Sequence, residues 1–205
     1  MPPSANTALS YAAGPMDGQY AEPYNSTIIE LLEERLGDVE GPVVLDTGPV
    51  CGENISYLAR RVKRLHVCDL FLRLVHDRAK GLEDHKLWRH LDYPPHSLDA
   101  IIIWDLVDRL DDPQAETLVK LIGRLLRPGG HLVLFALDEQ MSRLPVNTFV
   151  LGEDYLVSMR PQPHLEMELH VRQNREVLAM FTAFSCIRSF LYRNGLREFL
   201  FQLSA

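Results

Sequence analysis

The stretch that decides the fold is Gly41-Pro-Val-Val-Leu-Asp-Thr-Gly-Pro-Val-Cys-Gly-Glu-Asn-Ile-Ser-Tyr-Leu-Ala59. Three apolar residues lead into Asp46, and the turn that follows contains Gly48 and Gly52. Beyond the turn, apolar residues recur at helical spacing, at Ile55, Leu58, Ala59 and Val62. The pattern therefore predicts a strand, a tight glycine turn and a helix.

A strand that leads through a glycine turn into a helix presents backbone N–H groups and the positive end of the helix dipole to a ligand. Glycine suits such a turn because it adopts positive φ and lets a ligand approach the backbone closely. The stretch therefore indicates a site for a nucleotide-type cofactor. An ordinary turn between a strand and a helix also favours glycine, so the motif alone leaves both interpretations open.

Composition and charge narrow the class of protein. The chain has 205 residues, 46% hydrophobic and 24% charged, which is typical of one globular domain with a full core. Its formal net charge of −7 argues against general nucleic-acid binding. The three cysteines lack the spacing of metal ligands, which argues against a disulfide framework or a metal site. Without a leader pattern or a long apolar run, we expect a cytoplasmic protein with no membrane segment.

The N-terminal part divides into an arm and the start of a domain. Residues 1–23 are rich in Pro, Ala, Gly and Ser and show no period, which predicts a mobile arm. We expect residues 24–205 to form a single domain. Its first helix is predicted over residues 27–36, because Thr27 and Glu30 have capping-box spacing ahead of an apolar face.

Strand and helix patterns then alternate along the chain. Strands are predicted from apolar or alternating stretches at residues 43–46, 64–69, 86–92, 98–104 and 131–136. Helices are predicted from apolar residues at helical spacing at residues 52–62, 70–80 and 113–125. This alternation predicts an α/β fold with a mainly parallel sheet.

The alternation breaks at residues 137–172. Prolines and two alternating pieces, residues 155–159 and 165–170, predict an inserted loop followed by a hairpin. An insertion at the edge of a sheet suits either a substrate lid or a partner surface.

The end of the chain predicts one helix and a closing pair of strands. Asn174 is a candidate cap for the helix. Residues 187–192 and 196–203 are apolar runs that flank a turn with Gly195, which predicts an antiparallel pair.

Together these features resemble the class I S-adenosylmethionine-dependent methyltransferases, from about Thr27 to the end of the chain. The motifs that carry the resemblance are, in chain order, Val43-Val-Leu-Asp-Thr-Gly-Pro-Val-Cys-Gly52, Val67-Cys-Asp69, Leu91-Asp92, Ser97-Leu-Asp-Ala-Ile-Ile-Ile-Trp-Asp105 and Leu125-Leu-Arg-Pro-Gly-Gly-His-Leu-Val-Leu134. The resemblance implies a Rossmann-like fold with a seven-stranded, mostly parallel sheet, a reversed last strand and helices on both faces.

The resemblance also implies a site for S-adenosylmethionine at the carboxyl ends of the strands. Asp46, Gly48 and Gly52 would face the methionyl end of the cofactor. Asp69 would accept hydrogen bonds from the ribose hydroxyls, and Asp92 from the adenine amino group. The other residues implied to border the cofactor are Pro49, Asn54, Leu70, Tyr93 and Trp104. Of these, Leu70 or Tyr93 would sandwich the adenine ring, and Trp104 would border the sulfonium.

Val50 departs from the family pattern, which usually has glycine at this position of the loop. A β-branched residue tolerates positive φ badly, so the loop must differ from the family's or narrow the pocket. In the first case Val50 points away from the cofactor, toward the helix or the core. In the second case its methyl groups block the site.

Three functions compete at this point. The first is an S-adenosylmethionine-dependent methyltransferase acting on a small molecule or a protein, and the second is a non-catalytic interaction protein of the same fold. The third, an NAD-dependent enzyme, requires a G-x-G-x-x-G spacing that is absent. Methyl transfer depends mainly on alignment, so it needs no visible catalytic signature. Residues with side chains suitable for a base are Asp105, Asp108, His131, His164 and His170.

Overall fold

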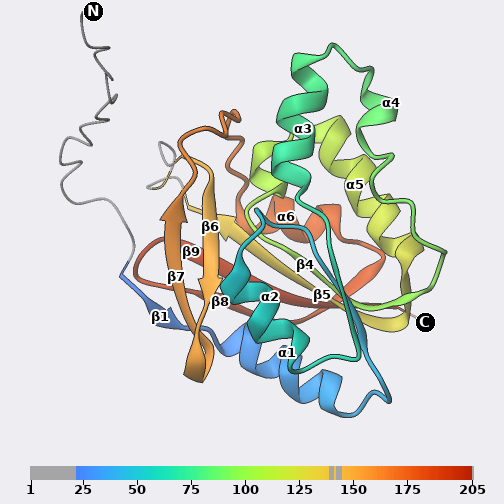
Figure 1. Ribbon diagram of the computed structural model, residues 1–205, viewed down its shortest axis with the longest axis vertical. Helices are drawn as coiled ribbons and strands as arrows, with labels where there is room; N and C mark the ends of the chain where they lie inside the picture. Colours follow the sequence, from blue (N-terminus) through green and yellow to red (C-terminus); the bar gives the residue numbers. More distant parts are fainter. Residues whose placement is uncertain (1–21, 139–140, 142–144, 205) are drawn as a thin grey trace, which may run out of the picture.

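The computed structural model describes residues 22–138, 141 and 145–204, and it contains a central sheet and a smaller one (Figure 1). The central six-stranded sheet has the order β3-β2-β4-β5-β9-β8. Its strands are β2 (Val43–Asp46), β3 (Arg64–Val67), β4 (Leu98–Ile103), β5 (Leu126–Leu137), β8 (Phe184–Leu191) and β9 (Leu196–Leu203). Strands β2 to β5 are parallel, and β9 is antiparallel to both β5 and β8. The predicted α/β, Rossmann-like fold with a reversed last strand is therefore confirmed.

Helices cover both faces of this sheet. They are α1 (Thr27–Gly37), α2 (Gly52–Ala59), α3 (Leu70–Ala79), α4 (Asp84–Leu87), α5 (Asp112–Leu125) and α6 (Asn174–Met180), with short 3-10 turns η1 (Val107–Arg109) and η3 (Glu153–Tyr155). Side chains alternate along β9, so Phe201 and Glu198 point to opposite faces. Phe201 stacks on Phe181 at the end of α6, whereas Glu198 accepts a hydrogen bond from Ser26, the N-cap of α1. The predicted capping box, with Thr27 as the N-cap, is therefore wrong by one residue, because Ser26 is the N-cap and accepts from the amide of Ile29.

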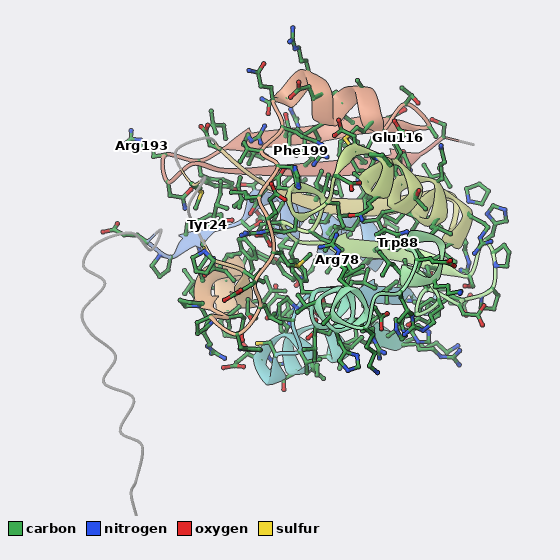
Figure 2. The ribbon with its side chains drawn as sticks, turned by 90° about the horizontal axis from the view of Figure 1, so that it is seen from above. Tyr24, Arg78, Trp88, Glu116, Arg193 and Phe199 are labelled. Carbon is green, nitrogen blue, oxygen red and sulfur yellow. The ribbon has the colours of Figure 1, made fainter. Side chains whose placement is uncertain are left out.

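Strands β4 and β9 contribute many of the buried residues of the core. All six residues of β4 are buried, as expected for a central strand covered on both faces. Gly195 has a φ of +82° in the turn between β8 and β9, which explains why glycine is required there. Figure 2 shows Phe199 of β9 inside the molecule and Arg193 of the turn at its outer corner.

The predicted third strand, residues 86–92, is wrong. The segment contains the end of α4 and turns, so β3 is the edge of the sheet and the sheet has six strands instead of seven. Leu87, Trp88 and Leu91 are the buried apolar residues here, and their spacing is helical instead of alternating.

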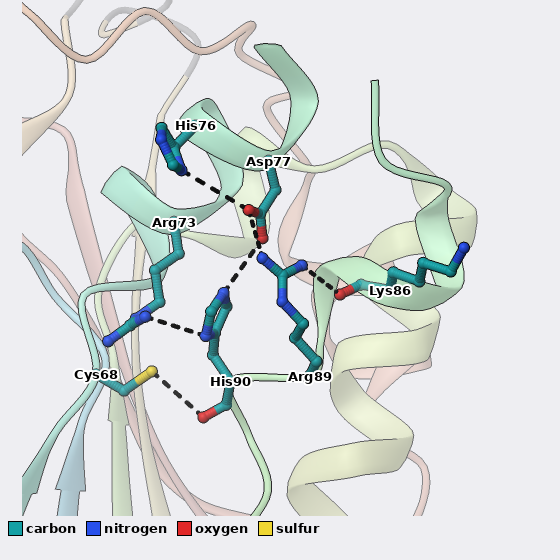
Figure 3. A network of polar contacts seen from close by, with 7 residues as sticks. All are labelled: Cys68, Arg73, His76, Asp77, Lys86, Arg89 and His90. Atoms are coloured by element: carbon teal, nitrogen blue, oxygen red, sulfur yellow. Dashed lines mark hydrogen bonds and ion pairs between the residues drawn. The ribbon is translucent and has the colours of Figure 1, made fainter. Parts of the chain in front are cut away.

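A buried carboxylate holds this segment on α3 (Figure 3). Asp77 is 1% exposed and accepts a hydrogen bond from Arg89 at 2.7 Å. Its other oxygen lies 3.2 Å from His90 Nε2, and Arg73 lies 3.0 Å from His90 Nδ1. Because arginine only donates, Nδ1 must accept and Nε2 must carry the hydrogen toward Asp77. The Cys68 thiol also contacts the His90 carbonyl at 3.6 Å, which ties the segment to the end of β3.

The smaller sheet has the order β1-β7-β6, with all pairs antiparallel. Its strands are β1 (Tyr24–Asn25), β6 (Asn147–Leu151) and β7 (Leu156–Pro161). The predicted pairing of residues 155–159 with residues 165–170 is therefore wrong, because the partner of β7 precedes it in the chain. Backbone hydrogen bonding attaches the later segment elsewhere, since the amide of His170 donates to the carbonyl of Asp108.

The hairpin β6–β7 stands beside α2, on the opposite side of the molecule from α4 and α5 (Figure 1). Of the predicted arm, residues 1–21 lie outside the described residues. In the described part of the chain, no helix is long and apolar enough to cross a membrane.

We predict that Asp77→Asn lowers the free energy of unfolding at pH 7 by about 1–3 kcal/mol, because Arg89 and His90 lose a buried, charged acceptor. The hydrogen bond from Arg89 holds the pKa of Asp77 below its ordinary value. A lowered folded-state pKa stabilises the protein above the unfolded-state pKa of about 3.9, and this stabilisation is lost as the pH falls through the folded-state pKa. Urea unfolding at pH 7 and pH 3 should therefore show a smaller difference at pH 3. Exposed Glu34→Gln is the control, and an equal difference at both pH values would contradict the assignment.

Candidate functional site

The candidate site lies at the carboxyl ends of β2, β3 and β4, where parallel strands bring their ends to one edge. Asp46 at the end of β2 pairs in register with Val67 of β3 and Ile102 of β4. The turn after Asp46 is tied to both neighbours. Thr47 donates to the carbonyl of Ile102 through its hydroxyl at 2.9 Å, and its own carbonyl accepts from the amide of Leu70. Hydrogen bonds within the chain itself therefore join the turn to the ends of the neighbouring strands.

Asp46 is a buried carboxylate that the chain itself satisfies. It is 2% exposed, and its Oδ1 accepts from the amide of Gly48 at 3.0 Å and from the indole Nε1 of Trp104 at 2.7 Å. Burial raises its pKa above the ordinary value for aspartate. A cation brought to this position would replace the weaker neutral donors, because charge-assisted hydrogen bonds are stronger.

Trp104 lies directly on the glycine turn. A Cβ added to Gly48 would come within 2.3 Å of the indole ring, so only glycine fits under this side chain. The ring stacks on Phe149 of β6, with centroids 5.5 Å apart, and also contacts Phe135 of β5. Trp104 is only 1% exposed, and Pro49 beside it is buried as well. The indole therefore fills the space above the turn.

The loop accommodates Val50 without backbone strain. Val50 is not among the residues with positive φ, and its side chain is 63% exposed. Its side chain is therefore not packed against the helix or the core, so the expectation that it would turn toward them is wrong. Its amide donates to Asp69 Oδ2 at 3.2 Å, which draws the turn toward the end of β3.

Asp69 has a structural role at the start of α3. It is the N-cap of α3, where Oδ1 accepts from the amide of Leu72 at 2.8 Å. A carboxylate offers about four acceptor positions, so the two bonds from Leu72 and Val50 leave capacity for a ligand's hydroxyl groups. The side chain is half-buried and remains open to such a ligand.

The residues implied to border adenine differ in their exposure. Asp92 is exposed, and its carboxylate has no hydrogen bond within the described residues. Tyr93 is half-buried, with its ring 5.0 Å from that of His66 on β3. Leu70 is wholly buried and offers no face to a ligand, whereas Leu72 is 49% exposed next to Asp69. Leu72 is therefore a better candidate than Leu70, and its place in the first turn of α3 was the available signal.

Asn54 does not face the turn. It is 1% exposed, its Nδ2 donates to the carbonyl of Phe149 at 2.8 Å, and its Oδ1 accepts from the amide of Leu151 at 2.8 Å. The side chain thus acts as a strand partner that fastens β6 to α2. Gly52, at the start of α2, is exposed, and a Cβ there would meet nothing within 4 Å. Phe149 was missed by the sequence analysis, because its contact with Trp104 depends on this long-range bond.

The candidate bases closest to β4 are buried. Asp105 forms a 2.8 Å ion pair with Arg109, and both side chains are 1% exposed. Asp108 accepts from the amide of Leu137, and burial raises its pKa to about 7. His131 pairs with Ala100 near the amino end of β4, away from the site. Asp105 and Asp108 thus support the loops after β4 and β5 instead of lining an open surface.

The fold and this edge define a protein of the class I methyltransferase fold. A family model for the methyltransferase domain matches residues 16–191. The chain belongs to this family, whose members include S-adenosylmethionine-dependent enzymes, and the resemblance seen in the sequence is confirmed.

Curated relatives agree with this assignment. Methyltransferase GfsG of Streptomyces halstedii is 34% identical over 116 residues, which are 51% of this chain and 41% of the relative. Ubiquinone biosynthesis O-methyltransferase of Alkalilimnicola ehrlichii is 24% identical over 165 residues, which are 72% of this chain and 62% of the relative. The chain thus spans less than two thirds of the length of these relatives.

Solved structures share the fold at low sequence identity. N-methyltransferase NodS from Bradyrhizobium japonicum matches with a TM-score of 0.53 and 20% identity, over 86% of this chain and 94% of that chain. An S-adenosylmethionine-dependent methyltransferase from Clostridium acetobutylicum matches with a TM-score of 0.59 and 11% identity, over 87% and 91% of the two chains.

We predict that Asn54→Ala lowers the free energy of unfolding by about 1–3 kcal/mol, because two buried backbone groups of β6 lose their partners. Hydrogen exchange should show faster exchange of the Leu151 amide, while amides of β4 stay protected. Ser56→Ala, on the exposed side of the same helix, is the control. An unchanged exchange rate at Leu151 would argue against the role of the Asn54 side chain in holding β6.

Proposed function

We propose that this protein is a methyltransferase that uses S-adenosylmethionine to methylate a small molecule or a protein. The observation that carries the proposal is the placement of Asp46 and Asp69 at the carboxyl ends of adjacent parallel strands, on either side of a glycine turn. Ligands of open α/β sheets bind at this edge, and the chain belongs to a methyltransferase family.

The residues on the β3 side fit the adenosyl half of the cofactor. Asp69 keeps acceptor capacity for ribose hydroxyls, and Asp92 has a free carboxylate for an amino group within the described residues. Tyr93 and Leu72, each next to one of these acids in the chain or in the first turn of α3, expose apolar surface. On the β2 side, Asp46 has the charge that suits an ammonium group, and Gly52 leaves open space.

S-adenosylmethionine would supply an activated methyl group on a positively charged sulfur. The contribution of the chain is to bind and align, since alignment lowers the barrier of a displacement without a specialised catalytic group. Asp105 and Asp108 are too deeply buried to touch an acceptor in this conformation. The proposed enzyme therefore relies on positioning, without Asp105 or Asp108 as a base.

A second candidate function is a non-catalytic interaction protein of the same fold. One observation favours it: Asp46 and Asp69, the two strand-end acids, both accept hydrogen bonds from the chain, from Trp104 and Val50. The partner surface predicted over residues 137–172 and the predicted cytoplasmic location stay predictions.

We predict that Asp69→Asn weakens binding of S-adenosylmethionine by about 1–3 kcal/mol, because a charged acceptor for the ribose becomes a neutral one. Asparagine is as good an N-cap as aspartate, so α3 should keep its stability. Calorimetric titration of both proteins measures the affinities, and methylated product from the labelled donor provides a second readout.

The control is Asp111→Asn, which makes the same substitution at the N-cap of α5, a residue outside the proposed cofactor contacts. Equal affinity of folded wild type and Asp69→Asn would remove Asp69 from the site. A wild type that binds no S-adenosylmethionine under any condition would favour the non-catalytic function.

A further inference from the structure

We propose that Trp104 is an internal occupant of the methionyl half of the cofactor site, and that it sets the affinity for ligands carrying the amino-acid group. The proposal rests on the proposed function and deepens it. It adds a residue that selects among ligands by closing one half of the site while the other half stays open.

Trp104 holds the carboxylate of Asp46 by a hydrogen bond. That carboxylate is 2% exposed, and among the residues that the structure describes, the side chain that donates to it is that of Trp104, through Nε1 at 2.7 Å. An ammonium group that approached Asp46 Oδ1 would compete with this N–H, because Oδ1 already accepts from Trp104 and from the amide of Gly48. The indole also lies against Gly48 so closely that a Cβ would overlap it. A ligand segment crossing the turn at Gly48 therefore requires the indole to move.

Moving the indole has a cost that the surrounding contacts define. Trp104 leaves a buried aromatic cluster with Phe135 and Phe149, at centroid distances of 4.8 and 5.5 Å. Phe149 cannot simply follow, because the side chain of Asn54 hydrogen-bonds its carbonyl, and β6 is paired along its length with β7. When the competent state is a minor one, the apparent affinity falls by its fraction of the population.

The adenosyl half does not share this cost. Asp69, Leu72 and Tyr93 are at least partly exposed, and none of them has a hydrogen bond or ring contact with Trp104. A ligand that ends at the 5′ sulfur, such as 5′-methylthioadenosine, needs only this half. S-adenosylhomocysteine needs both halves. The geometry therefore predicts discrimination between two ligands that share one adenosyl group.

The test is calorimetric titration of the full chain with S-adenosylhomocysteine and with 5′-methylthioadenosine. Trp104→Phe keeps an aromatic ring but removes the N–H, and Trp104→Ala opens the position entirely. We expect both variants to bind S-adenosylhomocysteine about 5- to 30-fold more tightly than wild type, the range that one buried hydrogen bond and its packing span. Their affinity for 5′-methylthioadenosine should stay within about twofold of wild type, because that ligand does not compete with the indole.

Fluorescence gives a readout that needs no substituted site residue. The chain has two tryptophans, so Trp88→Phe leaves Trp104 as the single reporter. Its emission should shift to longer wavelength on adding S-adenosylhomocysteine, as the ring leaves its buried position, and should not shift with 5′-methylthioadenosine. Phe199→Leu, a buried aromatic of β9 away from the site, controls for general loosening of the core and should leave both affinities unchanged.

Each outcome decides the matter. Weaker S-adenosylhomocysteine binding by folded Trp104→Phe would make the indole a contact for the cofactor, which overturns the inference but keeps the proposed function. Equal strengthening for both ligands, or the same gain in Phe199→Leu, would also overturn it. If no folded variant binds either ligand, the proposed function fails and the inference fails with it.

Discussion

The hydrogen bond between Trp104 and Asp46 is the contact on which the carboxyl edge of the sheet depends. It joins the end of β4 to the end of β2 and lays the indole on Gly48. The ring also stacks on Phe149 of β6, so the smaller sheet is held against the central one. Gly48 is therefore required by a side chain of the protein itself, in addition to any ligand that approaches the turn. Replacing one member of this set disturbs the strand end, the turn and the hairpin together.

The two sides of the edge differ in how the chain treats its charges. On the β2 side the carboxylate of Asp46 is buried, and burial raises its pKa. On the β3 side Asp69 caps a helix and stays half-buried, with acceptor positions to spare. A buried acid without a cationic partner costs free energy unless donors surround it, and the indole N–H and the Gly48 amide are those donors. The same physics explains why a cationic ligand group would compete with the indole for this position.

The segment around residues 86–92 shows how a buried charge fixes the place of a segment in the fold. A strand was predicted at these residues, and it would have completed a seven-stranded sheet. Asp77 of α3 instead binds Arg89 and His90, which pulls the segment onto the helix and leaves β3 as the edge. The hairpin changed partners for a comparable reason. The carbonyl of Asp108 takes the amide of His170, so the later stretch is not available to pair with β7.

The sequence by itself determined the fold class, the closing antiparallel pair of strands and the two acids beside the glycine turn. These features follow from periodicity and turn residues within short stretches, where local chemistry and burial agree. Only the tertiary structure decided the number of strands, the role of Asn54 and the direction of Trp104. Each of these depends on a partner from another element: Asn54 binds backbone 95 and 97 residues away, and Trp104 reaches Asp46 across 58 residues. Such pairings are set by how elements pack against one another, and no local pattern records them.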